Sequence, residues 1–162
     1  MTAASIIKQL DQLIKLHKSL LKLAEQKTEA ITKNNIETLE KLLNEEQKHV
    51  KAINQVESQR QKEVKAFFVQ HPTASTSNMV DVISYVQNHE KEKLTAQREE
   101  LLQIINELKH KNNLNQKLIF NSLQYINLTL DMLRPQDAVF NYDKPAQTSQ
   151  QPPKRSMFDS QA

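Results

Sequence analysis

Residues 6–31 read IIKQLDQLIKLHKSLLKLAEQKTEAI, and the spacing within this stretch decides the fold. Mostly apolar side chains recur in alternating steps of three and four, at Ile7, Leu10, Ile14, His17, Leu21, Ala24, Thr28 and Ile31. This is the period of an α-helix with one apolar face. The stretch therefore predicts a long amphipathic helix over residues 3–32, whose apolar face needs partner helices to cover it.

The same spacing, bounded by capping residues and prolines, predicts three more helices, over residues 35–69, 78–86 and 88–133. Asn34 is followed three residues later by Glu37, which predicts an N-cap with a capping box at the start of the second helix. Asn78 is a candidate cap for the short third helix. The last helix must end at Arg134, because Pro135 follows.

The residues after position 133 have a different character. Four of the five prolines of the chain lie there, and no helical stripe continues. We therefore predict a flexible, disordered tail over residues 134–162. Residues 1–133 are predicted to form one all-α domain, an elongated antiparallel helical bundle or coiled-coil hairpin.

Composition excludes several classes of enzyme. The 162 residues include no Gly and no Cys. Phosphate-binding loops, dinucleotide-binding turns and nucleophile elbows need Gly, and thiolate metal sites and disulfides need Cys. The chain is expected to be cytosolic, without a membrane-spanning segment. The 22 basic and 19 acidic residues are interleaved, so the net charge of +3 does not indicate a nucleic-acid partner.

Two Glu-x-x-His pairs are the closest approach to a catalytic motif. Glu46 with His49 and Glu107 with His110 have the ligand spacing of di-iron helical bundles. Glu107 and His110 flank Leu108 on the helix and should project away from the apolar seam. His17 lies within the first stripe, where a partly buried, hydrogen-bonded histidine is expected. We therefore expect no metal, no cofactor and no catalysis.

The last helix carries more apolar surface than one intramolecular seam needs. Ile119, Leu123, Ile126, Leu130 and Leu133 form one row, and Leu118, Tyr125 and Met132 lie on other sides. Some of this surface should meet another molecule. Asn112 and Asn115 occupy positions of the stripe where Leu or Ile is usual, and two interpretations stay open: the amides mark a register or a kink within the chain, or they anchor a partner helix.

At this helix the chain resembles the FlgN family of flagellar type III export chaperones. The matching residues are Asn112-x-x-Asn115-x-x-Leu118-Ile119, Ser122-Leu123-x-Tyr125-Ile126-Asn127, Leu130-x-x-Leu133 and, in the tail, Asn141-Tyr142. The resemblance extends more loosely over the chain, through Ile36-Glu37-x-Leu39-x-x-Leu42-Leu43 and the Pro-rich end.

The resemblance implies a cytoplasmic, helical, non-enzymatic chaperone for the hook-associated proteins FlgK and FlgL, which form the hook-filament junction. Such chaperones bind the C-terminal helical part of the client, prevent its premature assembly and deliver it to the export gate protein FlhA, so they act transiently at the export apparatus. The implied client-binding residues are Asn112, Asn115, Leu118, Ile119, Leu123, Ile126, Asn127, Leu130 and Leu133. The implied gate-binding residue is Tyr142.

Three alternatives remain open at this stage. The same apolar surface fits a coiled-coil adaptor or scaffold, and it also fits a homodimer. A chaperone of the same system for another client, such as the filament cap, would have a chemically similar groove. An enzyme with a di-iron site would have to use Glu46, His49, Glu107 and His110.

Overall fold

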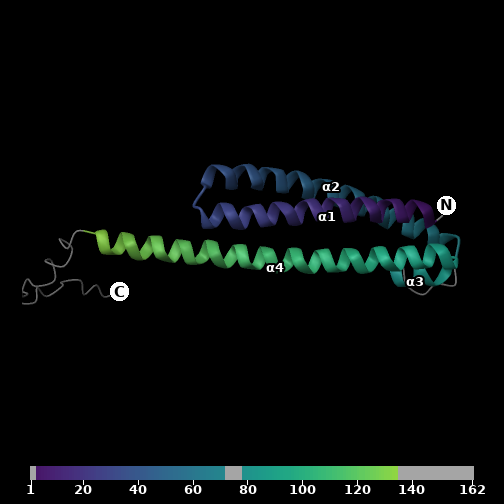
Figure 1. Cartoon of the computed structure of the whole chain (residues 1–162). Coiled ribbons are helices and arrows are strands. Elements are labelled where there is room, and N and C mark those ends of the chain that lie inside the picture. Colours follow the sequence, from purple (N-terminus) through teal and green to yellow (C-terminus); the bar gives the residue numbers. More distant parts are fainter. Residues whose placement is uncertain (1–2, 72–77, 135–162) are drawn as a thin grey trace, which may run out of the picture. The chain divides into compact units, whose positions relative to one another are not determined.

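The computed structural model describes residues 3–71 and 78–134. These residues form four helices and no strand: α1 (Ala3–Thr32), α2 (Ile36–Val69), α3 (Met79–Tyr85) and α4 (Asn88–Leu133) (Figure 1). The predicted all-α fold class is confirmed, and each predicted helix matches the observed bounds to within one residue. Beyond Arg134 the predicted tail lies outside the described residues.

The chain divides into two units, Met1–Tyr125 and Ile126–Ala162, and α4 contributes residues to both. The first unit holds α1, α2, α3 and α4 as far as Tyr125. The described part of the second unit is residues 126–134, at the C-terminal end of α4. The predicted division into a domain of residues 1–133 and a tail of residues 134–162 stays a prediction.

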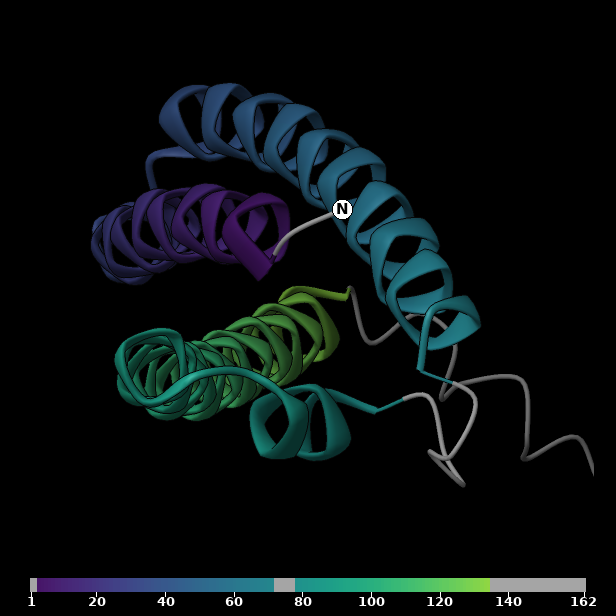
Figure 2. The ribbon, with the colours of Figure 1, turned by 90° about the vertical axis from the view of Figure 1, so that its right-hand side faces the viewer.

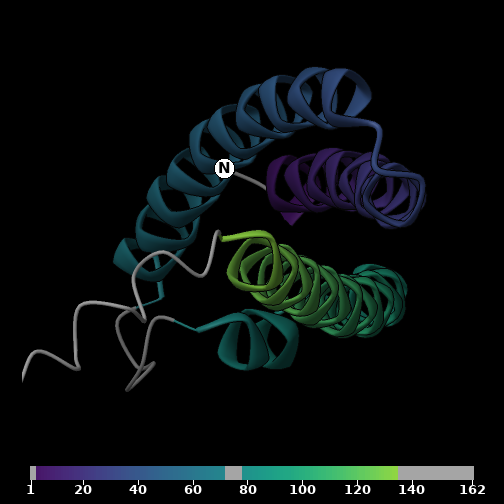
Figure 3. The same ribbon diagram turned by 90° about the vertical axis from the view of Figure 1, so that its left-hand side faces the viewer.

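Within the first unit, α1 lies between α2 and α4. Figure 1 shows α2 returning along one side of α1 and α4 following the other side, and Figures 2 and 3 show this order from both ends. Gln97 bonds to Ile7 and Asn115 bonds to Ala24, so α4 runs parallel to α1. Because α2 runs antiparallel to α1, it is also antiparallel to α4.

The core of the first unit is concentrated where the N-terminal half of α1 meets the end of α2, α3 and the start of α4. Leu94 and Val82 are fully buried there, beside Ile6 and Leu13 of α1. A smaller cluster of Leu20, Ala24 and Leu108 lies farther along α1 and α4. Burying a Leu or Ile side chain stabilises the fold by about 1.5–3 kcal/mol, so the first cluster is the main anchor of the bundle.

The turn between α1 and α2 uses two neighbouring asparagines. Asn34 has φ 52°, and the amides of Asn34 and Asn35 donate to the carbonyls of Ile31 and Ala30. This is a Schellman motif, whose left-handed residue is usually Gly, and the chain has none. The side chain of Asn35 accepts from the Thr38 amide at 3.0 Å and caps α2. The predicted cap at Asn34 is therefore wrong, because Asn34 is needed to end α1.

Aromatic rings and a confirmed cap hold α3 in place. Asn78 accepts from the Asp81 amide at 2.9 Å, as the sequence predicts for an N-cap. His71 stacks on Phe67 with ring centroids 4.5 Å apart, and its ring lies 5.8 Å from Tyr85. These contacts join the end of α2 to α3.

Candidate functional site

The predicted site residues of the first unit divide into buried and exposed sets. Asn115 is buried, and Asn112 and Leu118 are half-buried. Ile119 is 41% exposed and Leu123 is 54% exposed. Phe120, which the sequence analysis did not include, is 60% exposed. The row of exposed apolar side chains that the sequence analysis predicts therefore begins at Ile119.

Within residues 126–134, the described part of the second unit, every predicted site residue lies on the surface. Leu130 is 55% exposed, and Ile126, Asn127 and Leu133 are also exposed. Leu128 and Met132, on other sides of the helix, are exposed as well. Each large apolar side chain left in water costs free energy that a partner surface can recover by covering it.

Asn115 fixes the position of α4 on α1. Its amide nitrogen donates to the Ala24 carbonyl at 2.9 Å, and its amide oxygen accepts from the Thr28 hydroxyl at 2.6 Å. Both polar ends of the side chain are therefore used within the chain. The register interpretation accounts for Asn115 in this structure.

A second buried amide, Gln97, also fixes the register of α4 on α1, and the sequence analysis did not identify it. Gln97 donates to the Ile7 carbonyl at 3.1 Å and to the Asp11 carboxylate at 2.5 Å. It lies three residues after Leu94 and four before Leu101, on the apolar stripe, and this spacing is the signal that identifies it. The two amides lie 18 residues apart, which is about five helical turns, so they share one face of α4.

The end of α1 explains why the exposed row with Ile119 and Leu123 begins at Ile119. Thr28 meets Asn115, so the last residue of α1, Thr32, is level with Ile119, one turn further on. At this point a hollow of about 130 Å³ lies between α4 and the α1–α2 turn, with Ile36, Ile119 and Leu123 among its lining residues. Leu123 lies on the core-facing side of α4 but one turn beyond the reach of α1.

Glu46 and His49, the first Glu-x-x-His pair, make contacts between α1 and α2. Lys27 of α1 binds both carboxylate oxygens of Glu46, at 2.7 and 2.8 Å. Glu107 and His110 are exposed. Within residues 3–71 and 78–134, no three His, Cys, Asp or Glu side chains are grouped so as to hold a metal ion. The four residues of the di-iron alternative do not come together.

The two remaining histidines of the α1–α2 pair have ordinary structural roles. His17 is half-buried and its Nδ1 bonds to the Leu13 carbonyl at 2.7 Å, as expected. His49 Nδ1 bonds to the Glu45 carbonyl, which leaves Nε2 to accept from the Ser19 hydroxyl at 2.7 Å. Both members of this Ser-His pair lie inside helices, where the backbone amides are already bonded, so no oxyanion-binding donors lie beside Ser19.

Within α2, Glu57 and Arg60 form a two-point ion pair. The Arg60 guanidinium bonds to both carboxylate oxygens, at 2.6 and 2.7 Å, and these bonds hold the pKa of Glu57 below its ordinary value. Partial burial raises the pKa in opposition, and the nearby His17 lowers it slightly. The carboxylate therefore stays ionised and paired at neutral pH.

Comparison with known proteins identifies the family. The family model described as FlgN protein matches residues 1–150. The chain belongs to the FlgN family. This is a family of flagellar export chaperones, and its members are helical and non-catalytic. Membership fits a site made of exposed apolar side chains rather than titrating groups.

A relative of this FlgN-family chain matches it over its whole length. The chain is 37% identical over 164 residues to the uncharacterized protein YvyG of Bacillus subtilis (strain 168), and the match spans the full length of both proteins. No solved structure matches the chain significantly.

Two observations complete the description of this FlgN-family chain. Tyr142, which the resemblance implies as the gate-binding residue, lies outside the described residues. No helix in the described ranges has the length and apolar content required to cross a lipid bilayer.

Proposed function

We propose that this protein is the export chaperone of the hook-filament junction proteins FlgK and FlgL. In this proposal it binds their C-terminal helical regions in the cytoplasm, keeps them from assembling early and delivers them to the export apparatus. The observation that supports the proposal most is the row of exposed apolar residues along one side of α4: Ile119, Leu123, Ile126, Leu130 and Leu133.

The physical mechanism is the burial of this row by a client helix. An amphipathic helix places its own apolar stripe on such a row, with contacts at intervals of three and four residues. Full burial of one Leu or Ile is worth about 1.5–3 kcal/mol, and residues such as Leu123 and Leu130 have half of their surface still to bury. Leu118, which is half-buried, adds to the edge of the row.

The asparagines then divide between two tasks. Asn115 is used by α1, so we assign it to the register of the chaperone itself. The Asn112 side-chain oxygen is buried without a hydrogen-bond partner in the described part of the chain. We assign Asn112 and the exposed Asn127 to polar contacts with the client. A donor from the client would satisfy the Asn112 oxygen, which otherwise stays desolvated at a cost.

We further propose that Tyr142 binds the export gate protein FlhA. The support is the FlgN resemblance, which implies a gate-binding tyrosine after the client-binding helix. A Tyr142→Ala protein should bind FlgK and FlgL with unchanged affinity but lose affinity for FlhA, and export of the clients should fall. Normal export and normal gate binding by Tyr142→Ala would contradict this assignment.

A calorimetric titration tests the client assignment. The full chain should bind the C-terminal helical segments of FlgK and FlgL, and Leu123→Asp should abolish or greatly weaken binding because it places a charge in the buried interface. A filament-cap segment serves as the competing client. If only the filament-cap segment binds, the client is the filament cap and not FlgK or FlgL. If no segment binds and the protein self-associates with rising concentration, the adaptor or homodimer is favoured.

A further inference from the structure

A second apolar recess lies in the first unit, between α2 and α4. It is a cavity of about 310 Å³ with α1 as its floor, where Leu10 and Leu13 lie. Ile53 of α2 lines one side, Leu101 and Ile105 of α4 line the other, and Met79 of α3 also lines the cavity. This cavity is separate from the hollow at Ile119, because the two share no lining residue.

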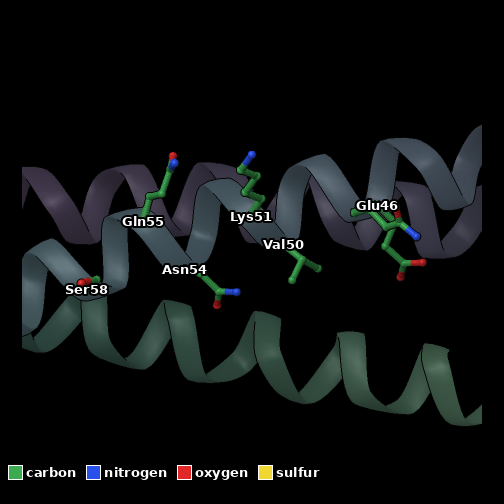
Figure 4. A pocket seen from close by; sticks show the side chains of 7 residues that line it. Glu46, Val50, Lys51, Asn54, Gln55 and Ser58 are labelled. Carbon is green, nitrogen blue, oxygen red and sulfur yellow. The ribbon is translucent and has the colours of Figure 1, made fainter.

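The walls of the recess continue as exposed apolar side chains. Leu43 and Val50 on α2 are each 43% exposed, and Leu102 and Ile105 on α4 are 45% and 39% exposed. Figure 4 shows that Val50 and Asn54 point from α2 to the side on which α4 runs, whereas Lys51 and Gln55 point away. Two antiparallel helices with a shared floor and apolar flanks form a groove suited to a further helix.

The charges at the recess leave one cation without a partner. Glu57 and Arg60 neutralise each other, and His17 is bonded to the Leu13 carbonyl. Arg98 lines the recess on an exposed turn of α4, and it makes no ion pair or hydrogen bond within the described residues. A helix that fills the groove would gain from a carboxylate three or four residues from its apolar anchor, within reach of this guanidinium.

We propose that the groove between α2 and α4 is a second docking surface for the exported client, and that it takes an amphipathic helix with an apolar anchor in the cavity and a carboxylate on Arg98. This inference rests on the proposed chaperone function and extends it. The client would then be held at two places, on the groove of the first unit and on the exposed row of α4, and linked contacts strengthen binding through effective concentration.

Thiol protection tests the proposal, because the natural chain has no cysteine. Single cysteines replace Leu102 in the groove, Leu130 on the exposed row and Gln59 on the outer face of α2, in the full chain. With the FlgK or FlgL C-terminal segment at about ten times its Kd, modification should slow about tenfold at Leu102→Cys and Leu130→Cys. The rate at Gln59→Cys should not change.

The other outcomes overturn the proposal in distinguishable ways. Protection of Leu130→Cys alone would contradict the groove as a docking surface and would leave the proposed function intact. No protection at either position would contradict both the groove as a docking surface and the proposed chaperone function. Protection of Leu102→Cys that appears without client and disappears on dilution would mean that a second copy fills the groove. Protection by dodecanoate but not by the client segment would mean a small-molecule site.

Charge reversal provides a variant that does not disturb packing. Arg98→Glu should raise the Kd for the client segment about tenfold at low salt, and the difference should shrink at high salt. Lys62→Glu, on the outer face of α2, makes the same change in net charge and should leave the Kd unchanged. An unchanged Kd for Arg98→Glu would overturn the assignment of an acidic partner helix.

Discussion

The Thr28 hydroxyl donates to the Asn115 side-chain oxygen at 2.6 Å, and this bond joins α1 to α4 across 87 residues of sequence. The same Asn115 side chain also donates to the Ala24 carbonyl. Because Gln97 repeats this arrangement near the other end of α1, two amides set the register of α4 on α1. The register matters for function because it decides where α4 loses the cover of α1.

Removing the Asn115 amide should destabilise the bundle. We expect Asn115→Ala to lower the free energy of unfolding by about 1–3 kcal/mol, since it deletes two buried hydrogen bonds. Asn113→Ala, an exposed neighbour on the same helix, should change it by less than about 0.5 kcal/mol. Urea unfolding measures both, and equal midpoints for the two variants would contradict the register role.

The two asparagines of the α1–α2 turn should respond differently to substitution. Asn35→Ala removes the α2 cap and should cost about 0.5–2 kcal/mol. Asn34→Gly keeps the left-handed backbone and should be nearly neutral, whereas Asn34→Val should destabilise because a β-branched residue disfavours positive φ. Thermal unfolding of the three variants checks the order. A larger loss for Asn34→Gly than for Asn35→Ala would restore Asn34 as the cap.

Removing one partner of the Lys27–Glu46 pair should destabilise the fold strongly, whereas replacing both partners by apolar residues should destabilise it little. Both side chains are mostly buried, so Lys27→Met alone leaves an unpaired carboxylate and should cost about 3 kcal/mol. The double variant Lys27→Met/Glu46→Leu should regain most of that loss, because two apolar side chains need no partner charge. A double-mutant cycle in urea gives the coupling, and simple additivity of the two single variants would refute it.

The Glu57–Arg60 pair predicts one part of the acid sensitivity. The pKa of Glu57 is held below the ordinary 4.5, so the pair stabilises the fold above that pH and the stabilisation is lost as the pH falls through the lowered pKa. In urea unfolding from about pH 7 to about pH 3, the free energy of unfolding of the wild type should therefore exceed that of Glu57→Gln. The difference should be constant above pH 4.5 and should shrink below it. A difference in free energy of unfolding that grows on acidification would contradict this prediction.

Much of the fold follows from local sequence. The step of three and four residues predicts all four helices, and Pro135 and Asn78 mark a helix end and a helix start within one residue. The excess of apolar residues after Asn115 is also visible in the sequence. These features are local because a helix forms from contacts within a few residues.

The rest depends on which helix covers which residue. A stripe does not tell whether Asn115 faces α1 or a partner, since both interpretations place it on the same side of α4. Lys27 and Gln97 were overlooked because polar residues on a stripe reveal their partners only once α1, α2 and α4 are assembled. The turn needed a left-handed residue, and without Gly the competition between Asn34 and Asn35 could not be decided from spacing.

The most direct measurement compares two leucines of the second unit in their effect on client affinity. Leu130 and Leu128 are each 55% exposed, but they lie two positions apart and therefore on nearly opposite sides of α4. Calorimetry with the C-terminal segments of FlgK and FlgL should show binding lost or greatly weakened in Leu130→Asp and retained in Leu128→Asp. Equal affinities for the two variants, or a loss confined to Leu128→Asp, would contradict the assignment of the client to the exposed row of α4.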